Sequence, residues 1–86
     1  MIEKDARRFL RRMIKHNGFI ADGIYEEHPR FWKSNNSHST SLMDLGIFGF
    51  LKRGGYIKRD NQGRYLITEK GYKFAAPWYK RIFQHA

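Results

Sequence analysis

The chain contains no cysteine, only two prolines and few acidic residues, and these shortages exclude whole classes of protein. Without cysteine, the chain can form neither a disulfide scaffold nor a cysteine-based zinc site. No apolar run approaches the roughly 20 residues that a transmembrane helix needs. With 86 residues, 41% hydrophobic and 16% aromatic, the chain is too apolar for disorder. We therefore expect one folded domain over residues 1–86, with no membrane partner and no cofactor.

The shortage of acidic residues leaves a large positive charge. Seventeen Lys and Arg face eight Asp and Glu, which gives a formal net charge of +9. On so small a domain this charge favours a polyanionic partner, with nucleic acid ahead of an anionic membrane. No nucleophile, base and carboxylate are arranged for catalysis, and the histidines lack metal-ligand spacing. The composition predicts a cytoplasmic binding protein rather than an enzyme.

Three segments before residue 54 have the pattern of a helix. Residues 3–16 place apolar side chains at helical spacing, with Arg and Lys between them. Asp22 is a candidate N-cap for a short second helix, which Pro29 closes. Residues 38–53 are apolar almost all round and end at Gly54, which indicates a third, centrally buried helix.

A β-hairpin is predicted after the third helix. Two alternating stretches, YIKR and RYLI, flank the turn sequence DNQG. A type I turn with Gly63 in the left-handed conformation pairs Asp60 with Arg64 and sets Ile57 opposite Ile67. The hairpin then rests on the core by its isoleucines and projects a charged tip into solvent.

A closing helix is predicted over residues 69–85, capped by Thr68 and interrupted at Pro77. One apolar stripe of this helix faces the core, and a second stripe is left for solvent in a single chain. Two packed chains would hide the second stripe, so we expect a homodimer. The predicted interface residues are Phe74, Trp78 and Ile82.

The order of three helices, a two-stranded hairpin and a closing helix resembles a winged helix-turn-helix domain. The segments IADGIYEEH, STSLMDLGIFGFLKRGGYIKR and GRYLITEKGYKFA are similar to the helix-turn-helix, recognition helix and wing of MarR-like and PadR-like bacterial regulators. The resemblance covers about residues 5–76. It implies an α+β fold and double-stranded DNA as partner. It also implies a small transcriptional regulator, such as a repressor, associated with the nucleoid.

The resemblance also assigns the DNA-contacting residues. It puts the recognition helix, at about residues 38–53, in the major groove, and the wing, at 56–67, on the DNA backbone. Base contacts would come from the polar residues at and before the start of that helix: Lys33, Asn35, Asn36, His38, Ser39, Thr40 and Ser41. The wing would contact phosphates or the minor groove through Lys58, Arg59 and Arg64.

Each of these segments also has a plainer interpretation. Residues 29–37, rich in Ser and Asn, suit a solvated loop, and charges on the wing suit protection of an exposed strand edge. Phe31 and Trp32 either stack on bases or pack that loop onto the core. A winged helix can also bind an acidic protein through the same charges, and we keep this alternative function open.

Overall fold

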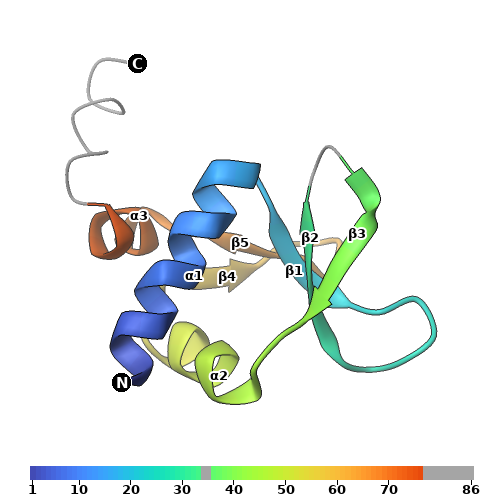
Figure 1. Cartoon of the computed structure of the whole chain (residues 1–86), viewed down its shortest axis with the longest axis horizontal. Coiled ribbons are helices and arrows are strands. Elements are labelled where there is room, and N and C mark those ends of the chain that lie inside the picture. The colour runs from blue at the N-terminus through green and yellow to red at the C-terminus, as the bar shows by residue number, and fades with distance from the viewer. Residues whose placement is uncertain (34–35, 77–86) are drawn as a thin grey trace.

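In the residues that the structure describes, three helices and one five-stranded sheet make up the fold (Figure 1). The computed structural model describes residues 1–33 and 36–76. The elements follow in the order α1 (Ile2–His16), β1 (Phe19–Asp22), β2 (Pro29–Lys33), β3 (Asn36–Leu42), α2 (Leu45–Arg53), β4 (Ile57–Arg59), β5 (Tyr65–Ile67) and α3 (Glu69–Ala75). The strands pair antiparallel in the order β3-β2-β1-β5-β4. The domain is thus a small α+β domain, as predicted at that level.

Helix α1 lies at the centre of the helical layer and packs against both α2 and α3 (Figure 1). It buries the apolar stripe that its spacing predicted, Ala6, Phe9, Leu10 and Met13. Asn17 ends the helix in the left-handed conformation, with φ at 48°, and the Gly18 N–H donates to the Met13 carbonyl at 2.9 Å. This C-terminal motif is the one that Asn and Gly favour, so the predicted boundary is confirmed.

The predicted second helix, with Asp22 as its cap, is wrong. Residues 23–28 form the loop of a hairpin, and the whole of β1 pairs with residues 29–32 of β2. The Gly23 N–H donates to the His28 carbonyl at 3.1 Å and closes this loop. Pro29 stands at the first position of β2, where proline is tolerated in a sheet. The pairing of two apolar strands outweighs the weak local preference of this segment for a helix.

The predicted third helix, over residues 38–53, is wrong in its first half. Residues 36–42 form β3, and α2 begins only at Leu45. Asp44 is the N-cap, because its Oδ1 accepts from the Ile47 N–H at 3.0 Å. The Ser and Thr residues before it are poor helix formers, and their backbone pairs with β2 instead. Three strands therefore separate α1 from α2, and the described residues contain no helix-turn-helix.

The hairpin predicted over residues 56–67 is confirmed in its register, but it is not a separate two-stranded wing, because β5 also pairs with β1 and the hairpin is part of the five-stranded sheet. We keep the name wing for the hairpin of β4 and β5. Strands β4 and β5 pair with Ile57 opposite Ile67, and both side chains are turned towards the helices. Gly63 has φ at 80°, the left-handed conformation that the turn requires, and the Asp60 N–H donates to the Arg64 carbonyl at 2.8 Å. Local turn chemistry was sufficient to predict this hairpin.

Helix α3 begins where the sequence predicted. The Thr68 hydroxyl accepts from the Gly71 N–H at 3.1 Å and donates to the Gly55 carbonyl at 2.7 Å. This one side chain therefore caps α3 and ties it to the turn that follows α2. The predicted continuation to residue 85, with its interruption at Pro77, lies outside the described residues.

The last carbonyls of α3 are bonded by arginines of α1. The Arg7 Nε donates to the Phe74 carbonyl at 3.2 Å, and the Arg11 Nε donates to the Ala75 carbonyl at 2.8 Å. Carbonyls in the last turn of a helix lack partners within the helix, and cationic donors suit them well. Two of the basic residues of α1 thus help to hold the helical layer together.

Candidate nucleic-acid interface

The face of the sheet opposite the three helices carries no described helix. Ile20, Phe31 and Ile57 pack into the core with residues of the helices. Since side chains alternate along a strand and directly paired residues share a face, the strand neighbours of these three point the other way. We call this surface the open face, and it consists of Phe19, Ala21, Arg30, Trp32, Leu42, Lys58, Arg64 and Leu66.

Two aromatic rings and an arginine follow one another across the open face. The rings of Phe19 and Trp32 are almost parallel, at 7°, and their centroids are 6.3 Å apart. The Cζ of Arg64 lies 5.5 Å from the centroid of the Phe19 ring. The Trp32 Nε1 donates to the Ala21 carbonyl at 3.2 Å, which fixes the indole against β1. Aromatic rings interleaved with cations are typical of surfaces that bind nucleic acid.

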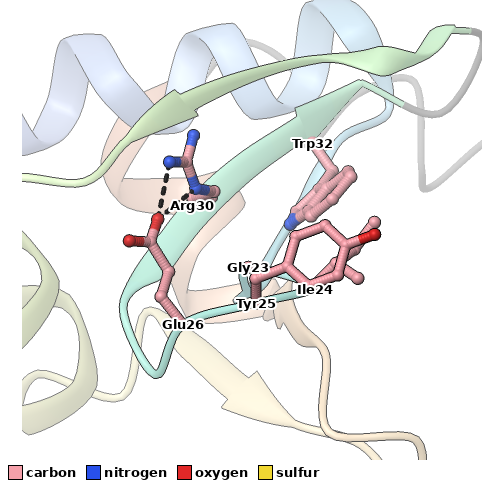
Figure 2. Close-up of a pocket in the computed structure, with 6 residues that line it drawn as sticks. All are labelled: Gly23, Ile24, Tyr25, Glu26, Arg30 and Trp32. Carbon is pink, nitrogen blue, oxygen red and sulfur yellow. Dashed lines mark hydrogen bonds and ion pairs between the residues drawn. The ribbon is translucent and has the colours of Figure 1, made fainter.

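A shallow hollow of about 350 Å³ opens beside Trp32 (Figure 2). The β1–β2 loop forms one wall, where Tyr25 is 96% exposed and Ile24 is 77% exposed. Figure 2 shows Tyr25 and Trp32 at one end of the hollow, and the pair of Arg30 and Glu26 at the other end. The Nη2 of Arg30 lies 2.6 Å from the Glu26 Oε1. The hollow thus combines aromatic surface with a hydrogen-bond donor and an acceptor.

The wing carries three cations, Lys58 and Arg59 on the edge strand β4 and Arg64 just before β5. Lys58 and Arg59 are exposed and form no ion pair with another described residue, whereas Arg64 pairs with Asp60 at 3.0 Å. Hydrogen bonds from the backbone N–H groups of Arg64 and Gln62 lower the pKa of Asp60 from its ordinary value. Asp60 therefore stays ionised at neutral pH and holds the tip that presents Lys58 and Arg59.

The predicted DNA-contacting residues fall into two groups at opposite edges of the sheet. Lys58, Arg59 and Arg64 lie on the hairpin of β4 and β5, which forms one edge of the sheet. The other group does not form the start of a helix. It lies on the hairpin of β2 and β3 and comprises Lys33, Asn36, His38, Ser39, Thr40 and Ser41. Asn35 lies outside the described residues.

Phe74, which was predicted to lie exposed for a dimer partner, packs within its own chain. Its ring stacks on Tyr56, with the centroids 4.4 Å apart, and the Cζ of Arg7 lies 4.7 Å from the centroid of Phe74. The side chain is half-buried by these contacts. The other predicted interface residues, Trp78 and Ile82, lie outside the described residues, so the dimer stays a prediction for those two.

Sequence reasoning missed the open face because it interpreted residues 29–37 as a loop. Phe31 is fully buried and meets the Phe9 ring edge-on at 5.3 Å, whereas Trp32 faces away from the core. Of the two interpretations of this aromatic pair, packing onto the core is confirmed for Phe31, whereas stacking on bases stays a prediction for Trp32. The alternation of PRFW was the available signal, since it is the pattern of a half-buried strand.

Comparison of the chain with protein-family models, with curated proteins and with solved structures found no match. In residues 1–33 and 36–76, no three His, Cys, Asp or Glu side chains lie together in a way that could hold a metal ion. No helix in that part of the chain has the length and apolar character to cross a membrane. A function must therefore be proposed from the geometry and charge of the surface.

Proposed function

We propose that the protein binds double-stranded DNA and acts as a small transcriptional regulator. The observation that carries this proposal is the wing, where exposed Lys58 and Arg59 stand on a hairpin whose tip is held by Asp60 and Arg64. Cations on an ordered hairpin contact phosphates with little loss of conformational freedom. The net charge of +9 adds long-range attraction to any polyanion.

The hairpin of β2 and β3 is the better candidate for reading bases. The major groove admits a two-stranded β-ribbon as well as a helix, and β3 is an edge strand with the polar sequence NSHSTSL. Helix α2 is poorly suited, because its cap, Asp44, is a carboxylate and its first turn, from Leu45 to Phe48, is apolar. A carboxylate at this end would repel phosphates. We therefore assign base reading to the hairpin of β2 and β3, and not to the helix for which the sequence predicted it.

The hairpin of β2 and β3 and the wing are spaced for a single duplex. They lie at opposite edges of a five-stranded sheet, which puts β3 and β4 about 19 Å apart at the usual strand spacing. One turn of B-DNA is about 34 Å long, so a duplex can meet both elements within a turn. A regulator of this kind represses transcription by occupying a promoter on the chromosome. This mode of repression requires no cofactor.

The proposal is tested by fluorescence anisotropy with a labelled random duplex over a series of salt concentrations. Log affinity should fall linearly with log salt, by about 0.9 per phosphate contacted. Lys58→Ala with Arg59→Ala should make that slope shallower by about 2, since two phosphate contacts are lost. The matched control, Lys4→Ala with Arg8→Ala, removes the same charge from exposed positions of α1, outside the wing.

Two outcomes contradict the proposal. Equal slopes for the wing variant and the α1 control would exclude the wing as the contact surface. No binding even at low salt would exclude DNA altogether and direct attention to an acidic protein as the partner.

The base-reading role is tested separately by site selection from a random duplex library. Asn36→Ala or Ser39→Ala should relax the base preference at particular positions while leaving the salt dependence intact, because base contacts specify and phosphate contacts position. An identical selected sequence for wild type and both variants would exclude this strand as the reading element.

We propose self-association as part of the same function, through Trp78 and Ile82. A two-fold dimer doubles the contacts to a palindromic site, and large apolar side chains gain most from burial at such an interface. Trp78→Glu should convert the dimer to a folded monomer in light scattering. A monomeric wild type, or an unchanged dimer mass in the variant, would exclude this interface.

A further inference from the structure

The open face offers flat aromatic rings, on which a ligand with flat surfaces of its own can stack. We infer, resting on the proposed binding of nucleic acid, that this face binds unpaired bases of a single-stranded nucleic acid. The hollow between Tyr25 and Trp32 is the site of one base (Figure 2). A duplex cannot use this surface in the same way, since its base faces are covered by their stacked neighbours.

The exposure of Tyr25 is the first argument for this inference. Folding buries almost none of this ring, which is 96% exposed, and its neighbour Ile24 is 77% exposed. Both line the hollow beside Trp32, whose volume of about 350 Å³ lies near the lower end of the ~300–1,000 Å³ range typical of small-ligand sites. A base placed there would contact the indole and the phenol ring together and remove apolar surface from water.

The distribution of charge decides which part of a nucleotide enters the hollow. Glu26 lines it and would repel a phosphate, but its carboxylate can accept from the amino group of a base. Arg30, paired with Glu26 at 2.6 Å, supplies donors beside that acceptor. The hollow therefore suits the edge of a base, and the phosphates must lie elsewhere.

The open face supplies positions for those phosphates. From Trp32 the aromatic surface continues to Phe19, 6.3 Å away between ring centroids, and then to Arg64, 5.5 Å from the Phe19 ring. Lys58 lies beyond, on β4, and is exposed. A strand that places a base beside Trp32 can thus run across β1 and β5 towards cations at the wing. The aromatic rings and the cations of the open face therefore both favour a single-stranded nucleic acid as the ligand.

The test uses Trp32 as its own reporter. In a Trp78→Phe background Trp32 is the remaining tryptophan of the chain, so its emission reports contact with a base directly. We expect an unlabelled dT15 oligonucleotide to quench this emission, and a 15-base-pair duplex to quench it much less. Tyr25→Leu should weaken dT15 binding about tenfold, because stacking on one aromatic ring contributes roughly 1–3 kcal/mol per base.

Matched variants at the same exposed position separate stacking from simple apolar contact. Tyr25→Phe keeps the ring and should retain the affinity for dT15, whereas Tyr25→Leu keeps only apolar bulk. Neither change should alter duplex affinity by more than about twofold, since the wing is untouched. A parallel titration with an rU15 oligonucleotide shows whether the natural strand is DNA or RNA.

The outcomes distinguish this inference from the proposed function. Equal dT15 affinity for wild type and Tyr25→Leu, or no quenching of Trp32, would overturn single-strand binding at the open face. If duplex binding still depends on Lys58 and Arg59 in that case, the proposed function stands alone. Tenfold weaker dT15 binding in Tyr25→Leu, with unchanged duplex binding, supports both.

Discussion

Asp60 and Arg64 close the tip of the wing with bonds in both directions. The Asp60 Oδ1 accepts from the Arg64 N–H at 2.9 Å, and its Oδ2 accepts from the Arg64 Nε at 3.0 Å. In return, the Asp60 N–H donates to the Arg64 carbonyl at 2.8 Å. The Arg64 guanidinium also lies 5.5 Å from the Phe19 ring centroid, so the same residue links the wing to the open face.

The first prediction concerns the side chain of Asp60. Asp60→Ala removes both side-chain acceptors at the turn, and Asp60→Asn keeps an oxygen for the backbone N–H groups but loses the charge that faces Arg64. Urea unfolding should therefore rank wild type above Asn and Asn above Ala in midpoint. Equal midpoints for all three proteins would show that the turn forms without this side chain.

The lowered pKa of Asp60 gives the same site a pH signature. A carboxyl group with a lowered folded-state pKa contributes stability that is present above its unfolded pKa, near 3.8, and is lost as pH falls through the folded value. Asp60→Ala should thus flatten the fall in stability below about pH 4. An equally steep loss of unfolding free energy below about pH 4 in wild type and in Asp60→Ala would contradict this prediction.

The second prediction concerns His16, at the C-terminal end of α1. Desolvation, followed by the positive charges of Lys33, Lys15 and Arg12, lowers its pKa from the ordinary value of 6.5. His16 therefore binds a proton more readily in the unfolded chain than in the folded one. The contribution of neutral His16 to stability is fully present above its unfolded pKa of 6.5, and it is lost as the pH falls below that value. Urea midpoints measured from pH 7.5 to 5.5 should decline for wild type and less for His16→Gln. An identical decline in the urea midpoint for wild type and His16→Gln would show that His16 does not cause the pH dependence.

The parts of the fold that local chemistry determines were predictable from the sequence. The wing follows from a turn sequence with Gly63 between alternating stretches, and the start of α3 follows from Thr68 as a cap. In the candidate site, the wing cations Lys58, Arg59 and Arg64 were therefore placed on the correct element. Each of these features depends on residues fewer than a dozen positions apart.

The other parts depend on pairing between distant strands. Residues 36–42 carry no apolar repeat of either period, so their strand state comes from pairing with β2 and not from their own sequence. Once residues 29–33 form a strand, the alternation of side chains places Phe31 in the core and Trp32 on the open face. The hollow beside Trp32 could not be predicted, since its wall at Tyr25 was assigned to a helix.

The third prediction concerns the arginines that bond to α3. Replacing Arg7 and Arg11 by Gln removes charged donors to the Phe74 and Ala75 carbonyls and the cation over the Phe74 ring. We expect a loss of about 1–2 kcal/mol in unfolding free energy, together with faster amide exchange in α3. The control Arg8→Gln changes an exposed residue of the same helix and should cost less than about 0.5 kcal/mol. Equal losses in the two proteins would show that the bonds from Arg7 and Arg11 to α3 contribute no stability of their own.

The fourth prediction contrasts two glycines inside helices, Gly49 and Gly71. A Cβ on Gly71 would clash with the Tyr56 carbonyl oxygen and would lie 2.7 Å from the Ile67 Cγ1, so the helix and the wing would have to separate. Gly71→Ala should therefore destabilise the fold by about 1–3 kcal/mol, the usual cost of overpacking. The glycine is needed here because α3 begins directly against the backbone that follows Gly55.

At Gly49 no other backbone of the described residues lies close, and the nearest atom to an added Cβ is at the flexible end of the Arg53 side chain, at 2.9 Å. That side chain can move, so Gly49→Ala should gain about 0.5–1 kcal/mol of helix propensity. Opposite signs for the two Gly→Ala changes in urea unfolding are the expected result. If both variants are stabilised, α3 does not pack on Tyr56 as closely as described, and the support that this contact gives to the wing is lost with it.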